Sequence, residues 1–198
     1  MPGVQIEIVP NAAVPAQSSL LIDRSHLLAV AAFLRDDPQT RLDYASNVTG
    51  VDWLDVVLQE KVRVKREYQG AMIDVDETVQ TVKPGYLEVV YHLYSMALKQ
   101  GPLILRVRTV NRTDRTHAPS LTPIYRGAEF QEREIYDLYG VVFDGHPDLR
   151  RLLMWEEFQD HPMRKDYIEP DDYQYEPTPH DEVLEKARAH YPKEAPHA

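Results

Sequence analysis

Two stretches in the middle of the sequence have the residue pattern of β-strands. Residues 87–94 and 103–110 are rich in Val, Ile, Leu and Tyr, and β-branched and aromatic side chains suit a pleated sheet. The segment 99–102 between them contains Gly and Pro, which favour turns. We therefore predict two neighbouring strands joined by a hairpin at 99–102.

The region before these strands also alternates between apolar and polar residues. Residues 42–53 predict a strand that leads into a turn at Thr49 and Gly50. Residues 54–68 alternate aliphatic with charged side chains, which is the pattern of a strand with one buried face. Residues 111–119, after the central strands, are polar and predict a loop.

Helical spacing of apolar residues begins near residue 27. Asp23 or Ser25 can accept hydrogen bonds from the free backbone N–H groups at the start of a helix. The sequence Asp-Asp-Pro at 36–38 ends this helix, because proline cannot continue it. The apolar positions that follow helical spacing are Leu27, Leu28, Ala31, Ala32 and Leu34.

A second helix is predicted over residues 123–139. Thr122 followed by Pro123 suits its N-cap and first turn, and Gly140 suits its C-terminal stop. On a helical wheel one side forms an apolar arc that includes Ile124, Ala128, Ile135 and Leu138. The opposite side predicts a solvent-exposed ladder of charges at i, i+4 spacing, which consists of Glu129, Arg133 and Asp137.

Glu132 falls at the aromatic edge of the predicted apolar arc, between Tyr125 and Tyr139. A carboxylate in such a position needs a partner or must become neutral. One interpretation is that Glu132 receives an arginine, from Arg150 or Arg151 or from another subunit, and fixes the following loop. The alternative is a carboxylate that reaches solvent along the tyrosines.

Together the elements predict an α+β fold: a mixed β-sheet with two main helices packed on one face. We divide the sequence into an irregular lead-in (1–19), the α+β domain (20–167) and an extended C-terminal arm (168–198). The arm contains eight acids, three bases and five of the 15 prolines. Such a composition is unlike that of a packed segment.

Composition narrows the functional classes. The protein has 198 residues, no cysteine and a net charge of −10. Without cysteine it has no thiolate nucleophile and no Cys-ligated iron–sulfur cluster, and the acidic charge disfavours nucleic acid or anionic lipid as a partner. The longest apolar run, 27–34, is far shorter than the roughly 20 residues of a membrane span. With no secretory signal at its start, we expect a soluble, cytoplasmic protein that meets a membrane only through partners.

The densest charge lies between residues 129 and 167. Two His-Pro steps, at His146 and His161, are each followed by a pair of bases, Arg150-Arg151 and Arg164-Lys165. We expect these four cations to pair with carboxylates of this chain or of a partner, because a guanidinium matches carboxylate geometry.

The two histidines, together with Glu132 and Asp137, also suggest a metal site. However, the neighbouring bases make the local field cationic, and the spacing is not the helical His pair of a zinc protease. We therefore predict that each histidine forms hydrogen bonds that shape a turn. A free-standing metal-dependent hydrolase is the alternative from a different functional class.

Residues 132–151 resemble the signature of the 30-kDa subunit family of respiratory complex I, which is the C subunit of the bacterial NADH:quinone oxidoreductase. The segment His-Pro-Met-Arg-Lys-Asp-Tyr at 161–167 resembles the closing motif of that family, and the likeness covers about residues 20–167. The matching signature residues are Glu132, Arg133, Glu134, Asp137, Gly140, Phe143, Gly145, His146, Pro147, Asp148, Leu149, Arg150 and Arg151.

This resemblance implies a non-catalytic structural subunit of the peripheral arm of a proton-translocating enzyme, on the cytoplasmic side of the bacterial inner membrane. It implies partner subunits, mainly the 49-kDa subunit near the quinone-reducing region and adjacent iron–sulfur subunits. FMN, iron–sulfur clusters and quinone would lie in those partners, with no cofactor or metal in this chain. The residues implied to shape or make the contacts between subunits are Glu132, Arg133, Glu134, Asp137, His146, Arg150, Arg151, His161, Arg164, Lys165 and Asp166.

Two stretches depart from the family pattern. The connection between Trp53 and Leu87 is longer than expected and predicts an added hairpin, and the sequence at 154–157 is unusual. Related subunits also occur in ferredoxin-driven complexes and membrane-bound hydrogenases. An equivalent subunit of such a complex is therefore the alternative within the family.

Overall fold

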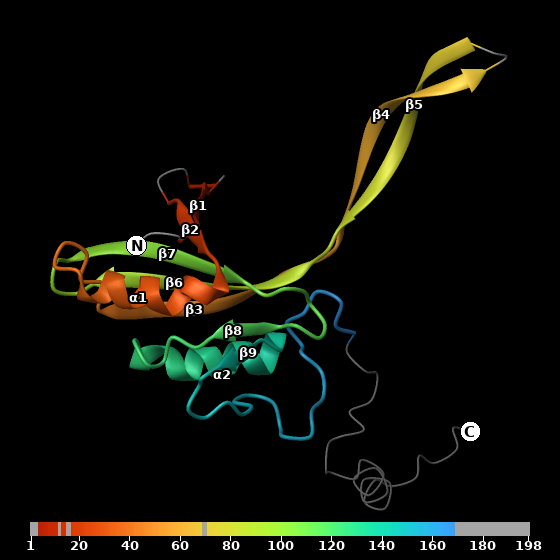
Figure 1. Ribbon diagram of the computed structural model, residues 1–198. Coiled ribbons are helices and arrows are strands. Elements are labelled where there is room, and N and C mark those ends of the chain that lie inside the picture. Colours follow the sequence, from red (N-terminus) through yellow and green to blue (C-terminus); the bar gives the residue numbers. More distant parts are fainter. Residues whose placement is uncertain (1–3, 12, 15–16, 69–70, 169–198) are drawn as a thin grey trace, which may run out of the picture.

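The computed structural model describes residues 4–11, 13–14, 17–68 and 71–168. Its centre is a five-stranded sheet with strand order β1-β2-β7-β6-β3 (Figure 1). β2 and β7 run parallel and the other neighbours antiparallel, so the sheet is mixed, as predicted. In chain order these strands are β1 (Ile6–Val9), β2 (Ser19–Ile22), β3 (Tyr44–Trp53), β6 (Tyr86–Ser95) and β7 (Gln100–Arg108).

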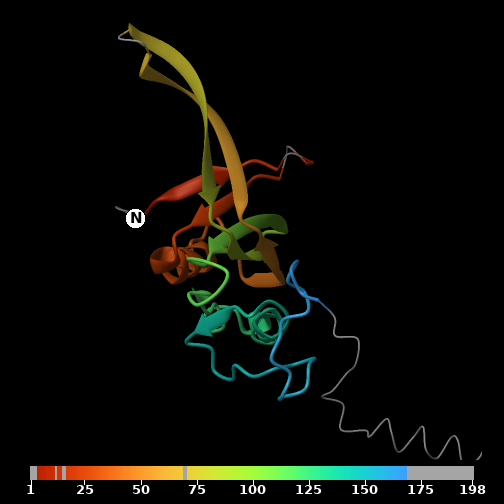
Figure 2. The same cartoon turned by 90° about the vertical axis from the view of Figure 1, so that its right-hand side faces the viewer.

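The core lies on one face of this sheet. Alternate residues of β6 are completely buried on that face: Leu87, Val89, Tyr91 and Leu93. Both helices, α1 (Leu27–Asp36) and α2 (Glu129–Tyr139), contribute to the same core cluster, and they lie on the same side of the sheet in Figure 2. The predicted α+β fold with two helices on one face is confirmed.

Two further pairs of strands lie outside the main sheet. β4 (Val56–Tyr68) and β5 (Ala71–Lys83) pair antiparallel along their whole length and project from the domain as a long arm (Figure 1). The added hairpin predicted between Trp53 and Leu87 is therefore confirmed. The short strands β8 (His117–Pro119) and β9 (Val142–Asp144) pair in parallel beside α2, so the predicted loop at 111–119 ends in a strand.

The N-terminal lead-in differs from the prediction. The lead-in was expected to be irregular, but β1 lies within it and pairs with β2 from Ile6–Ile22 to Val9–Ser19. This segment thus joins the sheet edge through backbone hydrogen bonds, although its sequence lacks a strong strand pattern.

The predicted arm, 168–198, lies outside the described residues apart from Ile168. Within the described ranges, no helix is long and apolar enough to cross a membrane.

The start of α1 follows the predicted capping. The Asp23 carboxylate accepts a hydrogen bond from the Ser25 backbone N–H at 2.9 Å. It caps a short 3₁₀ turn, η1 (Arg24–His26), which continues directly into α1. The helix ends at Asp36, where the Asp-Asp-Pro sequence predicted its end.

The sequence pattern predicts two turns at the wrong positions. The turn expected at Thr49 and Gly50 is wrong, because β3 continues through both residues. Gly50 instead allows a close approach of α2, since a Cβ there would lie 2.6 Å from the Tyr139 ring. The β6–β7 hairpin is confirmed, but its turn occupies 96–99 rather than 99–102.

The second helix is shorter than predicted, because it begins at Glu129 rather than at 123. A turn comes first, in which the backbone N–H groups of Ile124 and Tyr125 both donate to Leu121 O. Tyr125 is extended (φ −124°, ψ 97°) and is followed by the 3₁₀ turn η2 (Arg126–Ala128). This backbone buries the Tyr125 ring and lets its hydroxyl donate to Ala31 O of α1 at 3.3 Å. Gly140, at φ 76°, ends the helix as predicted.

Candidate functional site

The side of α2 that was predicted to face solvent is covered by the segment that follows the helix. Asp137 is fully buried and Arg133 is 7% exposed, so the predicted exposed ladder is wrong for these two residues. Residues 145–167, which we call the anchored loop, fold back across this side of the helix (Figure 1). A charged helix face is therefore buried, because polar groups of the loop satisfy it.

Asp137 is the main attachment point of the anchored loop. Its Oδ2 accepts three consecutive backbone N–H groups, from Leu152 (3.0 Å), Leu153 (2.7 Å) and Met154 (2.9 Å). Its Oδ1 accepts the Arg151 guanidinium at 2.7 Å. Burial alone would raise the pKa of Asp137, but these donors outweigh it and hold the pKa below its usual range. The carboxylate is therefore charged at neutral pH and fixes the loop backbone.

Arg133 attaches the same loop from one turn earlier on α2. Its Nε donates to Arg150 O at 3.2 Å, and its Nη2 donates to Arg151 O at 3.1 Å. A buried guanidinium thus holds the backbone of the Arg-Arg pair, while the Arg151 side chain returns to Asp137. The Arg150 side chain remains largely exposed and pairs with Asp148 at 3.0 Å. The predicted pairing with carboxylates of this chain is confirmed for both arginines.

The two histidines bind backbone groups, as predicted. His146 Nδ1 accepts the Asp148 backbone N–H at 3.1 Å, so its Nε2 carries the proton and donates to Glu129 O at 3.0 Å. His161 Nδ1 lies 3.0 Å from Asp137 O. Burial lowers the pKa of His161 and favours its neutral form.

The second His-Pro segment closes the C-terminal end of α2. The last four carbonyls of a helix have no partner within it, and here each has one. Gly140 N donates to Tyr136 O, His161 reaches Asp137 O, Met163 N donates to Leu138 O, and Arg164 Nε donates to Tyr139 O at 2.7 Å. Arg164 also places positive charge at the negative end of the helix dipole. This segment therefore acts as a cap on α2.

Glu132 has a different environment from both interpretations of the sequence. It is fully buried, so the solvent-reaching alternative is wrong, and its bonds come from neutral groups rather than from Arg150 or Arg151. Burial raises its pKa, although the hydrogen bonds oppose this shift. The donors are the Tyr91 hydroxyl (3.1 Å), the Ser120 hydroxyl (2.6 Å) and the Leu121 N–H (2.8 Å). Glu132 thus ties α2 to the sheet and to the turn before the helix.

Sequence reasoning missed a second ion-pair cluster, which holds the end of the anchored loop. Arg112 makes a bidentate contact with the buried Asp52, with both N–O distances at 2.7 Å, and also binds Asp166 at 2.8 Å. Asp52 further accepts the Lys165 backbone N–H at 2.9 Å. No sequence signal links Asp52 with Arg112, since 60 residues separate them.

Several predicted site residues remain on the surface. Glu134, Arg150 and Asp166 have exposed side chains, and Lys165 Nζ lies 5.8 Å from the Trp53 ring centroid. They are accessible to a partner, in contrast to the buried members of the set, Glu132, Arg133 and Asp137.

The anchored loop also displays apolar side chains. The Leu153 side chain is 62% exposed although its backbone N–H is bound to Asp137, and Met163 is 53% exposed although its N–H is bound to Leu138 O. Leu152 and, on α2, Phe130 are exposed as well. A partner could bury these side chains, and their fixed backbone would lower the entropic cost of that contact.

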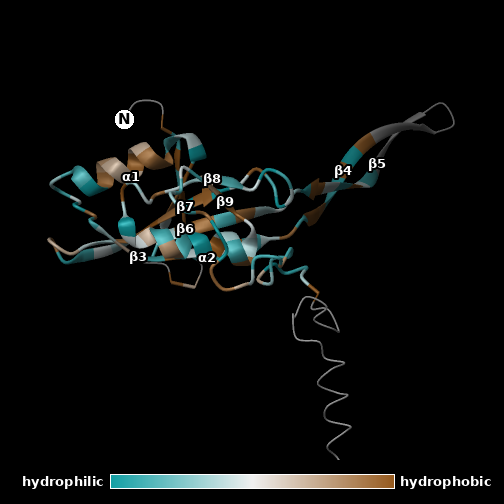
Figure 3. Cartoon of the chain, turned by 90° about the horizontal axis from the view of Figure 1, so that it is seen from below, coloured by the Kyte–Doolittle hydropathy of each residue, from teal (hydrophilic) through white to brown (hydrophobic). Residues whose placement is uncertain are grey.

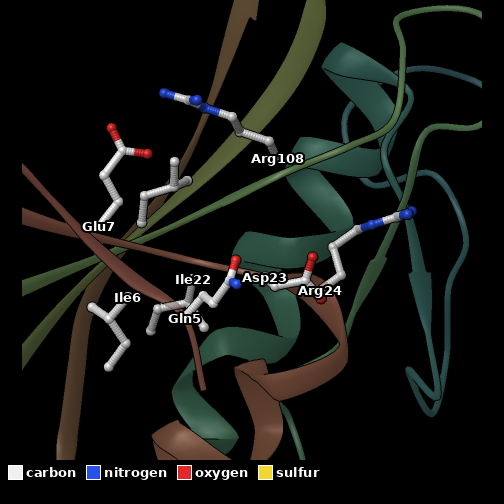
Figure 4. A pocket seen from close by; sticks show the side chains of 8 residues that line it. Gln5, Ile6, Glu7, Ile22, Asp23, Arg24 and Arg108 are labelled. Atoms are coloured by element: carbon white, nitrogen blue, oxygen red, sulfur yellow. The ribbon is translucent and has the colours of Figure 1, made fainter. Parts of the chain in front are cut away.

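No described part of the protein gathers three or more His, Asp or Glu side chains in a way that could hold a metal. A pocket of about 440 Å³ lies between β1, β2 and β7, away from the predicted residues (Figure 4). Glu7, Asp23, Arg24 and Arg108 line it together with aliphatic side chains, and in Figure 4 their charged groups point in different directions. The pocket therefore lacks a converging set of catalytic groups.

The fold and the site together define a small α+β domain whose charged signature fixes a loop with exposed apolar side chains. The family model of the respiratory-chain NADH dehydrogenase 30-kDa subunit matches residues 20–173. The chain belongs to this family.

Curated relatives support the assignment. The protein is 35% identical over 166 residues to the C subunit of NADH-quinone oxidoreductase from Saccharopolyspora erythraea, covering 83% of this chain and 55% of that protein. It is 38% identical over 148 residues to the same subunit from Coxiella burnetii, covering 72% of this chain and 63% of that protein. The chain thus spans between half and two thirds of the length of these relatives. Among solved structures, "Nqo5 of the trypsin-resistant fragment" aligns with 27% identity and a TM-score of 0.46, covering 74% of this chain and 90% of that one.

Proposed function

We propose that this chain is a non-catalytic structural subunit in the peripheral arm of a proton-translocating NADH:quinone oxidoreductase. It docks beside the 49-kDa subunit near the quinone-reducing region and contacts adjacent iron–sulfur subunits. It belongs on the cytoplasmic side of the bacterial inner membrane, with membrane contact only through the complex. FMN, iron–sulfur clusters and quinone are held by partner subunits, and nucleic acid is not a partner.

The observation that carries this proposal is the anchoring of the loop by Asp137. Three backbone N–H groups and one guanidinium converge on a single buried carboxylate. The side chains of Leu152 and Leu153 nevertheless point outward. Preorganised loops lose little entropy on association, so binding free energy is retained for the interface.

The chemistry of the signature residues supports a structural role rather than a catalytic one. Glu132 is sealed from solvent, and His146 uses both ring nitrogens for backbone groups. A general base needs a free lone pair that faces the substrate, and a metal ligand needs one that faces the metal ion. The polar groups with an exposed face, Glu134 and Arg150, are suited to salt bridges with a partner.

The test is affinity purification of the tagged protein from mildly solubilised membranes, with identification of the proteins that co-purify. We expect a 49-kDa-type subunit and an NADH-oxidising flavoprotein. Recovery of the 49-kDa-type subunit without the flavoprotein would mean that NADH is not the electron donor. That result would favour the ferredoxin- or hydrogenase-linked alternative. A protein that purifies alone would overturn the proposal.

A matched pair of variants addresses the docking surface directly. Leu153→Gln changes an exposed side chain of the anchored loop, and Leu98→Gln makes the same change at an exposed position in the β6–β7 turn. We expect Leu153→Gln to lower the recovered complex by roughly tenfold, the size of a central interface contact. Leu98→Gln should leave the yield unchanged. Equal yields from both variants would show that the anchored loop is not the docking surface.

A further inference from the structure

The β4–β5 hairpin has two unlike faces. Paired residues of an antiparallel ribbon lie on the same face and alternate along each strand. One face, which we call the aliphatic face, begins at Val56. Its described members are Val56, Leu58, Glu60, Val62 and Val64 of β4, with Glu77, Val79, Thr81 and Lys83 of β5.

The opposite face is polar beyond its first pair. Val57 lies opposite Val82 next to the domain, and polar residues follow toward the tip. These are Gln59, Lys61 and Arg63 of β4, with Asp76, Thr78 and Gln80 of β5. Arg63 and Asp76 form an exposed salt bridge at 3.3 Å. The hairpin therefore has the alternation of a sheet that buries one face and solvates the other.

Nothing in the described part of the protein packs over the aliphatic face. Val62 and Val79 are each 43% exposed, and Leu58 and Val56 are similarly open. The ribbon leaves the domain and extends away from both helices (Figures 1 and 2), and Figure 3 shows hydrophobic segments along it. An isolated two-stranded ribbon is at best marginally stable in water. Burial of one face by another molecule would supply the missing stabilisation.

We propose that the aliphatic face of β4–β5 docks on another protein subunit, at an aliphatic surface that carries a Lys or Arg side chain opposite Glu60. This inference rests on the proposed function, because it requires a multi-subunit assembly. Glu60 stands among the aliphatic residues and is exposed, and a carboxylate covered by a partner needs a cation from that partner.

The same carboxylate disfavours a lipid surface as the occupant. Anionic headgroups repel acidic groups, and the protein as a whole carries a net charge of −10. Glu60 on the aliphatic face would have to enter the membrane interface together with Leu58 and Val62. A protein surface with matching cations avoids this cost.

Photo-crosslinking within the purified assembly tests the inference. A benzophenone amino acid is placed at Val62 in one variant and at Lys61, the adjacent residue on the opposite face, in another. We expect Val62 to crosslink to one protein subunit of the assembly and Lys61 to give none of that product. A lipid adduct at Val62, or equal products from both positions, would overturn the proposal.

Two matched pairs of variants measure the contact. Val62→Thr with Val79→Thr changes the aliphatic face, whereas Val57→Thr with Val82→Thr makes the same change on the opposite face. We expect the first pair to lower the amount of the crosslinking partner subunit that co-purifies by roughly tenfold. The second pair should leave that amount unchanged. Likewise Glu60→Lys should weaken recovery and Lys61→Glu should not. Equal effects from the two faces would contradict the inference.

The outcomes separate the two proposals. If the unmodified protein recovers the assembly but the two faces of the hairpin behave alike, the docking of the hairpin is wrong and the proposed function stands. If the unmodified protein recovers no assembly, the proposed function fails, and the hairpin inference fails with it.

Discussion

The anchored loop and the β4–β5 hairpin expose apolar side chains in two different ways. The loop has no regular secondary structure, yet its backbone is bound to Asp137, Arg133 and the end of α2. The hairpin has regular hydrogen bonds along all of its length, yet no described part of the protein packs on its aliphatic face. Regular secondary structure is therefore not what fixes a surface in this protein.

The difference lies in where the stabilising contacts come from. The loop is held by buried charges of its own domain, so its shape is set before any partner binds. The hairpin has stabilising backbone bonds but lacks a core, so its packing has to be completed from outside. Substitutions of the residues that anchor the loop should consequently reduce the stability of the isolated protein, whereas the effect of substitutions on the hairpin should appear only in the assembly.

The largest effect is expected at Asp137. Asp137→Ala leaves three backbone N–H groups and the Arg151 guanidinium without their acceptor, which should lower the free energy of unfolding by about 3–5 kcal/mol. Urea denaturation of the isolated protein measures this loss. Asp148→Ala, at a half-exposed carboxylate of the anchored loop, is the control and should cost much less. A loss below about 1 kcal/mol for Asp137→Ala would mean that the loop is held by other contacts.

Alanine substitutions at Gly140 and Gly145 distinguish the cost of backbone strain from the cost of a steric clash. Both have positive φ, at 76° and 81°, but a Cβ at Gly140 would collide with the His161 ring, whereas a Cβ at Gly145 meets nothing within 4 Å. We expect Gly145→Ala to cost about 1–2 kcal/mol from strain alone and Gly140→Ala to cost clearly more. Thermal unfolding of the two variants provides the comparison. Equal costs would show that His161 moves aside freely and does not fix the helix end.

The pH dependence of stability should differ in sign between the two buried carboxylates. The pKa of Glu132 is raised above its usual value near 4.5, so the folded state holds this proton more tightly than the unfolded state. The resulting stabilisation is complete below pH 4.5 and is lost as pH rises through the folded pKa. The pKa of Asp137 is lowered below 3.8, so its stabilisation is present above that pH and is lost as pH falls through the folded pKa.

Urea titrations of Glu132→Gln and Asp137→Asn across this range test both signs. Relative to the unmodified protein, Glu132→Gln should gain stability as the pH rises above 4.5. Asp137→Asn should become less stable, relative to the unmodified protein, as the pH rises from the folded pKa of Asp137 to above 3.8. Parallel pH profiles for the two variants would contradict the assigned environments.

The smallest effect on the isolated protein is expected on the hairpin. Val62→Thr with Val79→Thr replaces exposed methyl groups, so the free energy of unfolding should change by less than about 0.5 kcal/mol. The same substitutions should reduce docking in the assembly, as described above. A clear loss of stability in the isolated protein would mean that the aliphatic face already packs within this protein.

The sequence predicted those parts of the fold that depend on local pattern. β6 and β7 follow from their β-branched and aromatic residues, and Gly140 ends α2 because its backbone is left-handed. The start of α2 could not be predicted from caps, since the burial of Tyr125 against Ala31 requires an extended residue before the helix. The contact depends on α1, and 94 residues separate its two partners in sequence.

The candidate site shows the same limit. The residue types around Asp137 and the histidines were identified, but the helical wheel placed Arg133 and Asp137 toward solvent because it could not include the loop that covers them. The donors to Glu132 come from β6 and from the turn at Ser120, 41 and 12 residues away. The spacing of apolar residues identifies only the apolar side of a helix. Burial of a second, polar side depends on the tertiary fold and therefore cannot be predicted from that spacing.

Docking through the anchored loop is the feature on which the proposed function depends most. Hydroxyl-radical footprinting tests it directly, by comparing oxidation of Leu153 and Met163 in the isolated protein and in the purified assembly. Both side chains are more than half exposed here, so both should react readily in the isolated protein. We predict that their oxidation falls several-fold in the assembly, and unchanged oxidation in an intact assembly would contradict docking through this loop.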